Sequence, residues 1–192
     1  MKIQVKFEKT GIEGAWLVHS TQLSDNRGAF REWFRYQDNL EITGSSFNVM
    51  QSNFSISNKG VIRGIHYSLN PIGQWKWVTC LAGSIFDVVA DIRPKSPTFG
   101  KIECLELSPE NGTGVLIQAN LGHAFQAKSD NTIVVYNITS EYNPEFEHEI
   151  NPFDLELRIQ WPIKKMILSR KDESAPTLNE LKDSNLLPRD FF

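Results

Sequence analysis

The segment 63–67 (Arg-Gly-Ile-His-Tyr) places a histidine and a cation in a strand-like run with apolar neighbours. Lys76 follows in the next such run, and Asp87 and Asp91 lie in the one after that. Charged groups in a strand-rich apolar region are costly unless they are paired or used for function. Hairpin connections would bring these groups close to His66, and a histidine among cations and carboxylates can accept and return protons near neutral pH. The stretch therefore predicts acid–base chemistry on a small bound molecule.

Other kinds of chemistry fit the sequence less well. A metal site in a β-roll would need a second histidine two residues after His66, and that position holds Ser68. His66 and His123 alone would supply too few ligands. The sequence has neither a Gly-x-Ser-x-Gly elbow nor a Gly-x-Gly-x-x-Gly dinucleotide fingerprint. Cys80 and Cys104 lie in apolar strand-like runs, so we expect reduced core thiols rather than a disulfide or a nucleophile. We therefore expect neither a metal nor a cofactor.

Several polar residues far from His66 in the sequence have two interpretations. Asp172 could hold one ring nitrogen of a catalytic histidine and stabilise its protonated form, but it could equally be a solvated charge in a polar loop. Tyr136 is most simply an aromatic residue at the edge of the core, and Tyr142 lies in a predicted turn. The residues alone do not decide between these interpretations.

Two further segments could contact a ligand. The run 47–57 alternates polar and apolar residues, so Gln51 and Asn53 share one strand face, which could be solvated or could line a polar cavity. The run 25–28 predicts a tight turn. Arg27 beside Phe30 would also suit an anionic, planar ligand, because guanidinium pairs with phosphate and aromatic rings stack on bases.

The composition limits the class of partner. A chain of 192 residues without a Gly/Ser/Pro-rich linker predicts a single domain over 1–192. Its formal net charge of −3 gives no basic field for a nucleic acid or an anionic membrane, while a small anionic ligand remains open. The start of the chain alternates polar and apolar residues and has no apolar run long enough for a signal peptide or a membrane span. We therefore expect a cytoplasmic protein.

The elements that must position these residues are predicted to be strands. Short β-prone runs recur with turn residues between them, which is typical of an all-β sandwich or closed roll. Helical patterns are limited to a turn at 36–40 and a short helix at 177–182, where Thr177 is the expected cap. The expected strands are 15–19, 29–34, 47–57, 75–81, 85–92, 102–107, 114–118, 124–127 and 132–139.

Taken in order, a set of short motifs resembles the dTDP-4-dehydrorhamnose 3,5-epimerase family, nucleotide-sugar epimerases with a cupin-type jelly roll. The resemblance covers residues 14–190, and its specificity comes from the order of the motifs, because each one alone is weak. The motifs are residues 25–32 (DNRGAFRE), 51–53 (QSN), 63–67 (RGIHY), 74–76 (QWK), 86–93 (FDVVADIR), 96–100 (SPTFG), 122–125 (GHAF), 136–139 (YNIT), 141–144 (EYNP), 161–162 (WP) and 168–172 (LSRKD).

The resemblance implies a cofactor-free, metal-free epimerisation at C3 and C5 of dTDP-4-dehydro-6-deoxy-D-glucose, giving dTDP-4-dehydro-L-rhamnose through an enolate. By the family pattern His66 is the base, Asp172 its partner, Tyr136 the acid on the opposite face of the sugar and Lys76 the group that stabilises the enolate oxygen. Positioned acid–base groups typically contribute roughly two to four powers of ten in rate.

The resemblance also implies a set of substrate-binding residues and a homodimer. Arg27 and Arg63 would bind the diphosphate, and His123 would lie close to the sugar. The family exchanges an N-terminal strand across the dimer, so that some of these residues would serve the partner's site. The residues expected around the nucleotide or sugar are Glu32, Gln51, Asn53 and Tyr142, with Arg27, Phe30 and Glu32 reaching across the dimer.

The chain departs from the family pattern at two places. Trp75 is bulky where a small residue is common, and the Pro-x-Gly turn before His123 is absent. Both positions could adjoin the pocket, so an epimerase of one centre, or a ketoisomerase, of a related dTDP-4-keto-6-deoxysugar is the alternative. Two further alternatives remain. One is a non-catalytic roll that binds nucleotide sugars, and the other is a metal-dependent oxygenase or isomerase.

Overall fold

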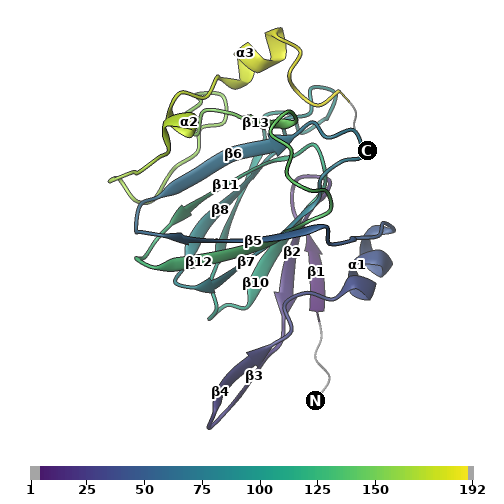
Figure 1. Ribbon diagram of the computed structural model, residues 1–192, viewed down its shortest axis with the longest axis vertical. Helices are drawn as coiled ribbons and strands as arrows, with labels where there is room; N and C mark the ends of the chain where they lie inside the picture. Colours follow the sequence, from purple (N-terminus) through teal and green to yellow (C-terminus); the bar gives the residue numbers. More distant parts are fainter. Residues whose placement is uncertain (1–4, 190–192) are drawn as a thin grey trace.

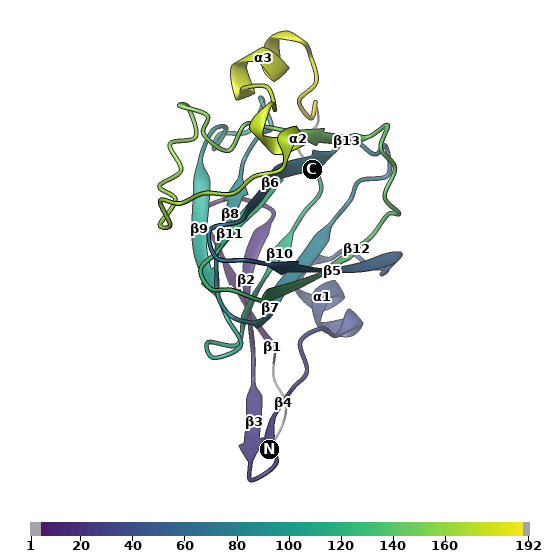
Figure 2. The ribbon, with the colours of Figure 1, turned by 60° about the vertical axis from the view of Figure 1, so that its left-hand side comes forward.

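The protein folds as two packed β-sheets with a protruding two-stranded arm (Figures 1 and 2). The structure is a computed structural model that describes residues 5–189, without the side chains of residues 36–39. One sheet has six strands in the order β1 (Val5–Lys9), β2 (Ala15–Ser20), β10 (Thr113–Ile117), β7 (Lys76–Ala82), β12 (Thr132–Ile138) and β5 (Gln51–Ser57). The other has five, in the order β13 (Glu147–Glu149), β6 (Ile62–Ser68), β11 (Gly122–Ala127), β8 (Ile85–Ala90) and β9 (Ile102–Leu107).

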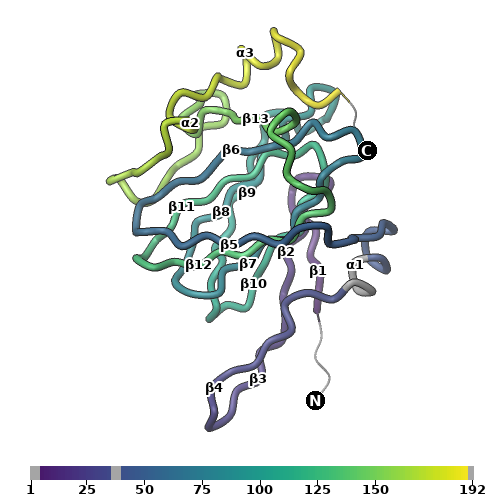
Figure 3. The backbone as a smooth tube through the Cα atoms, viewed as in Figure 1, coloured from purple at the N-terminus to yellow at the C-terminus, as the bar shows by residue number. Residues whose placement is uncertain are grey.

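The remaining elements lie outside the two sheets. The strands β3 (Gln22–Asp25) and β4 (Gly28–Arg31) form the arm, and three short helices follow in the described part of the chain: α1 (Tyr36–Thr43), α2 (Arg170–Glu173) and α3 (Leu178–Asp183). None of the helices in residues 5–189 is long and apolar enough to cross a membrane. The backbone trace shows the C-terminal segment passing over the β6 and β13 side of the molecule (Figure 3).

Alternation along the strands gives the protein three apolar clusters. One cluster, which includes Val78, Val89 and Val134, fills the space between the two sheets. Neighbouring residues of the five-stranded sheet, such as Val88, point to its other face and pack under the C-terminal segment. A third cluster, centred on the buried Trp77, covers the outer face of the six-stranded sheet. Successive side chains of a strand point to opposite faces, so both faces of each sheet are used.

The structure confirms the all-β jelly-roll prediction, with local corrections. The strand expected at 47–57 begins at Gln51, because Phe47 is buried against Trp77 on the outer face. The strand expected at 29–34 ends at Arg31, and β13 and α2 were not predicted. Cys80 is a buried free thiol as expected, but Cys104 is an exposed free thiol rather than a core residue.

The predicted turn and helix signals have clear physical causes. The run 25–28 is the tight turn of the arm, where Gly28 has φ 121. The helix α3 begins after Thr177, whose hydroxyl accepts from the backbone of Glu180 while the Glu180 side chain accepts from the backbone of Thr177. This reciprocal capping box explains why the helix start predicted at Thr177 agrees with the structure.

Candidate active site

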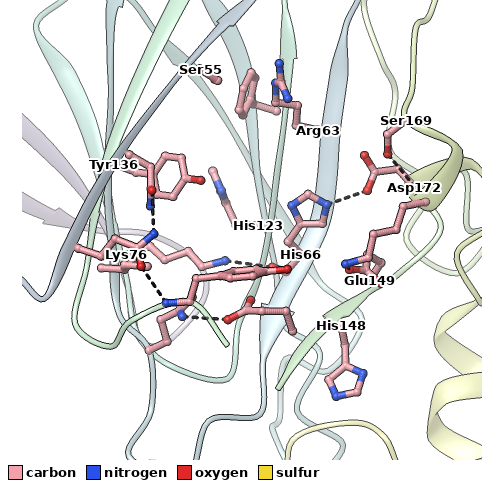
Figure 4. A pocket seen from close by; sticks show the side chains of 18 of the residues that line it. Ser55, Arg63, His66, Lys76, His123, Tyr136, His148, Glu149, Ser169 and Asp172 are labelled. Carbon is pink, nitrogen blue, oxygen red and sulfur yellow. Dashed lines mark hydrogen bonds and ion pairs between the residues drawn. The ribbon is translucent and has the colours of Figure 1, made fainter. Parts of the chain in front are cut away.

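A cavity of about 510 Å³ opens between the two sheets and receives side chains from both of them (Figure 4). Its lining combines apolar surface with many charged and polar side chains, and such convergent polar groups orient a bound ligand. The lining residues include Gln51, Asn53, Arg63, His66, Lys76, His123, Tyr136 and Tyr142, together with Glu147, His148, Glu149, Lys171 and Asp172. Most of the predicted site residues therefore meet in one cavity.

His66 and Asp172 form a hydrogen-bonded pair although they are far apart in the sequence. His66 Nε2 lies 2.7 Å from Asp172 Oδ1, and the Asp172 side chain is 5% exposed while that of His66 is 41% exposed. The hydroxyl of Ser169, the N-cap of α2, accepts from the Asp172 backbone N–H and so fixes the start of this short helix. A buried carboxylate of this kind can orient an imidazole and stabilise its protonated form.

The charge of Asp172 is maintained by its neighbours. Burial alone would raise the pKa of its carboxyl, but hydrogen bonds from His66, Ser169 and the Gly64 backbone outweigh burial and lower the pKa. Asp172 is therefore anionic at neutral pH, which is the form that a histidine base requires of its partner.

A second histidine–carboxylate pair lies beside the first. His123 on β11 is directly opposite His66 on β6, and its Nε2 lies 2.7 Å from Oδ2 of the fully buried Asp87. The two strands can approach closely because Gly64 has no side chain: a Cβ there would lie 2.5 Å from the His123 carbonyl oxygen. Of the two carboxylates expected close to His66, Asp87 joins the cavity wall through this contact. Asp91 does not: it is buried with Arg93, Ser96 and Thr98 and does not line the cavity.

Lys76 and Tyr136 face His66 from the opposite sheet. They lie on the adjacent strands β7 and β12, where Ile138 pairs with Lys76, so that Tyr136 is diagonal to Lys76 on the same face. Lys76 is 9% exposed, and its Nζ donates to the His66 carbonyl oxygen at 3.4 Å. Burial lowers the pKa of Lys76 and raises the pKa of Tyr136, and the charge of Glu147 raises both. Burial disfavours the charged form of each group.

The polar strand face of β5 lines the cavity, which settles the alternative that the sequence left open. Gln51 Nε2 donates to Asn53 Oδ1 at 2.8 Å, and Gln51 Oε1 accepts from the backbone N–H of Tyr142 at 2.8 Å. Asn53 pairs with Tyr136 across the sheet. Arg63 lies on the other wall, with its Nε 3.1 Å from Ser57 Oγ.

The three residues expected to reach a partner's site do not line the cavity of their own chain. Arg27, Phe30 and Glu32 lie on or next to the arm, which projects away from the sandwich in both views (Figures 1 and 2). The Arg27 side chain is 86% exposed and pairs with Asp25, and Phe30 is 62% exposed. Glu32 pairs with Arg35. The arm thus presents a cation and an aromatic ring to its surroundings.

Sequence reasoning missed several residues of the cavity. Glu147 and Glu149 lie on β13, whose alternation of two acids around His148 was the available signal, but three residues are too few to predict a strand. Lys171, next to Asp172, forms an ion pair with Glu149. The resemblance to the epimerase family includes both Lys171 and Asp172 but implies a role for Asp172 alone.

The arrangement can perform proton transfer on a small anionic substrate. A histidine supported by a carboxylate and a phenol project from different sheets toward one cavity (Figure 4), and a buried ammonium adjoins both. Such donors and acceptors suit removal of a proton next to a carbonyl and stabilisation of the resulting enolate. Residues 5–189, with the side chains of 36–39 set aside, contain no group of three or more His, Cys, Asp or Glu residues that could hold a metal ion.

The chain is similar to known nucleotide-sugar epimerases over almost its whole length. It is 43% identical over 178 residues to the dTDP-4-dehydro-6-deoxyglucose 3-epimerase of Streptomyces bikiniensis, covering 92% of this chain and 91% of the relative. The solved structure of NovW, a 4-keto-6-deoxy sugar epimerase of Streptomyces spheroides, matches with a TM-score of 0.94 at 39% identity, covering 97% of this chain and 94% of that one.

A third relative was solved with a ligand. The dTDP-6-deoxy-D-glucose-3,5-epimerase of Legionella pneumophila Philadelphia 1, in complex with dTDP-4-keto-L-rhamnose, matches with a TM-score of 0.92 at 38% identity, covering 98% of this chain and 100% of that one. The family model for dTDP-4-dehydrorhamnose 3,5-epimerase matches residues 9–180. The chain therefore belongs to the dTDP-4-dehydrorhamnose 3,5-epimerase family.

Proposed function

We propose that the protein epimerises dTDP-4-dehydro-6-deoxy-D-glucose at C3 and C5, giving dTDP-4-dehydro-L-rhamnose. The observation that carries this proposal is the position of the His66–Asp172 pair and of Tyr136 on opposite walls of one cavity, with the buried Lys76 beside them. Epimerisation needs a base on one face of the sugar and an acid on the other, and this arrangement offers both.

The proposed reaction carries out the same pair of proton transfers, one removal and one return, at C3 and at C5. His66 removes the proton from a carbon next to the C4 ketone, and the electron pair of the broken C–H bond moves into an enolate whose oxygen accepts from the Lys76 ammonium. Tyr136 then donates its proton to the opposite face of the same carbon, and solvent protons restore the phenol while His66 returns its proton to solvent. Asp172 stabilises the imidazolium that forms between these steps.

The nucleotide part of the substrate would be held by the polar β5 face and the cation on β6. Arg63 suits the diphosphate, because a guanidinium presents paired donors to phosphate oxygens. Gln51 and Asn53 offer amide groups to the sugar or base, and the exposed ring of Tyr142 at the mouth of the cavity offers a stacking surface. His123, fixed by Asp87, lies beside His66 near the sugar.

The closest alternative is an epimerase of a single centre. The relative named as a 3-epimerase is 43% identical to this chain, so identity alone does not separate the two activities. Incubation with the substrate in D2O separates them: we expect deuterium at both C3 and C5, whereas deuterium at one carbon alone would assign the single-centre reaction. A lack of exchange at both carbons would contradict the proposal.

We further propose a cytoplasmic homodimer in which the arm of each protomer completes the partner's site. Arg27, Phe30 and Glu32 do not line their own cavity, yet their side chains suit a nucleotide: a cation for phosphate and an exposed ring for a base. An isologous dimer would give both protomers the same contribution. The two free thiols fit a reducing compartment.

Mixing two inactive variants tests the exchanged arm. Co-refolding Arg27→Ala protein with His66→Ala protein should give mixed dimers in which one site has both an intact arginine and an intact histidine. Because half of randomly assembled dimers are mixed and each contains one complete site, activity should recover to about a quarter of the wild-type value. Epimerisation rate and light scattering measure the result. No recovery in proven dimers would place Arg27 at its own protomer's site, and a monomer would contradict the dimer.

A further inference from the structure

Gln74 is a buried residue of the cavity lining. The proposed proton transfers give it no role. It is 6% exposed and lies two positions before Lys76, so both side chains point to the same face of the extended chain. The segment remains paired with the end of β12, because the Trp75 backbone N–H donates to Thr139 Oγ1 at 2.9 Å and the Trp75 carbonyl oxygen accepts from the Thr139 N–H at 3.2 Å. The position of Gln74 is therefore fixed by the same sheet that carries Lys76.

The Gln74 amide connects two elements of the site. Its Nε2 donates to Ser140 Oγ at 3.2 Å and to Glu147 Oε1 at 3.0 Å. Ser140 is 3% exposed and follows β12, whereas Glu147 belongs to β13 of the opposite sheet and pairs there with Ser68. A hydrogen bond to a carboxylate is stronger than one between neutral groups. Gln74 thus holds the Glu147 carboxylate in the lining of the cavity, to which Lys76 also belongs.

Lys76 needs a counter-charge in this position. Its hydrogen bond to the His66 carbonyl oxygen does not balance the positive charge, because a carbonyl oxygen is neutral, and the nearby phenol of Tyr136 is neutral as well. Glu147 is the carboxylate whose charge raises the pKa of Lys76, against the lowering effect of burial. The titratable and charged groups that line the cavity around Lys76 are Arg63 and His66 on β6, His123 on β11, Tyr136 on β12, Tyr142 in the loop that follows, Glu147, His148 and Glu149 on β13, and Lys171 and Asp172 on α2. Asp87 on β8 lies next to His123, with its Oδ2 2.7 Å from the histidine Nε2.

We propose that Glu147, held in place by Gln74, is the counter-charge that keeps Lys76 protonated inside the cavity, and that Gln74 is therefore a positioning residue of the enolate-stabilising group. The catalytic consequence rests on the proposed function, since a charged ammonium stabilises an enolate oxygen more strongly than a neutral amine does. The protonation state itself does not depend on that function. Glu147 also favours the protonated phenol of Tyr136, so one carboxylate supports both proton donors.

The titration of Lys76 tests the proposal without any assay of activity. Protein carrying carbon-13 at lysine Cε is titrated by NMR, and the Lys76 signal is the one absent from Lys76→Met protein. In Glu147→Gln protein the titration midpoint of Lys76 should fall by about one unit or more, a tenfold change in the protonation equilibrium. Gln74→Met should shift it in the same direction by less, and Glu147→Asp, which keeps the charge, should restore most of the wild-type midpoint.

Glu145, two residues before Glu147, provides a matched control. Its side chain is exposed and does not line the cavity, so Glu145→Gln removes one negative charge and should leave the Lys76 midpoint unchanged. An unchanged midpoint in Glu147→Gln would overturn the proposal, as would an equal shift in Glu145→Gln, which would indicate a general charge effect.

The pH dependence of turnover gives the second readout. If wild-type protein epimerises the substrate, the alkaline limb of its kcat profile should move to lower pH in Glu147→Gln and Gln74→Met, because Lys76 then loses its proton earlier. A fall in kcat by the same factor at every pH would indicate packing alone and contradict the positioning role. Inactive wild-type protein with the expected shift in midpoint would instead refute the proposed function and leave the counter-charge intact.

Discussion

Replacing His66 by Asn should lower the rate of solvent exchange at the substrate's C3 and C5 by roughly two to four powers of ten, the usual contribution of a positioned general base. Asn is a smaller polar side chain that can form hydrogen bonds but cannot act as a base. Its partner Asp172 would remain in place, because it also accepts from the Gly64 backbone and is linked to Ser169. Exchange is measured by proton NMR in D2O.

Two controls separate this loss from damage to the pocket. His19 lies on β2, outside the cavity, and His19→Asn makes the same chemical change, so it should exchange at the wild-type rate. Calorimetric affinity of the His66 variant for dTDP should be nearly unchanged, because His66 is assigned to the sugar carbon rather than to the nucleotide. Wild-type exchange rates in His66→Asn protein would refute His66 as the base.

Replacing Lys76 by Met should lower kcat by about two to three powers of ten, which corresponds to about 3 kcal/mol of oxyanion stabilisation. Met has a similar length and is apolar, so the enolate oxygen would lose its charged donor while the cavity wall keeps its shape. KM should change less than kcat, because the interaction with a full negative charge on oxygen exists only after proton removal. Steady-state kinetics over a range of substrate concentrations measure both constants.

The stability of the Lys76 variant distinguishes a catalytic from a structural role. Burial lowers the pKa of this ammonium, so its charged form is disfavoured by folding, and an apolar replacement should leave the melting temperature unreduced. Lys95 is exposed, and Lys95→Met should retain wild-type turnover. A Lys76→Met protein that turns over normally would show that another group stabilises the enolate.

The fold could be predicted from the sequence because period-two alternation and turn residues are local signals. The strand at Ile102–Leu107 is a direct example, and the capping box at Thr177 located α3. The signal failed where tertiary packing overrides alternation, as at Phe47, whose ring packs against Trp77 instead of extending β5. It also failed for β13, a three-residue strand at the edge of its sheet that is defined by its pairing with β6.

The site was predictable in its chemistry and not in its assembly. The polar face of β5 could be read from alternation, but only the packing of two sheets shows that it lines a cavity. His66 and Asp172 are brought together by a C-terminal segment that folds back over β6, a contact that no local pattern encodes and that only the family resemblance indicated. Asp91 was wrongly expected close to His66. Instead, Arg93 balances its charge within the core and the Ser96 hydroxyl donates a hydrogen bond to it.

Solvent exchange catalysed by the wild-type enzyme is the decisive measurement for epimerisation at both carbons. The protein is incubated with dTDP-4-dehydro-6-deoxy-D-glucose in D2O, and the deuterium content and configuration of C3 and C5 are followed by NMR as the reaction proceeds. We predict deuterium at both carbons, inversion at both, and retained activity in the presence of a chelator. Conversion of the substrate without deuterium at either carbon would contradict proton transfer by His66 and Tyr136, as would folded protein that binds dTDP and exchanges neither proton.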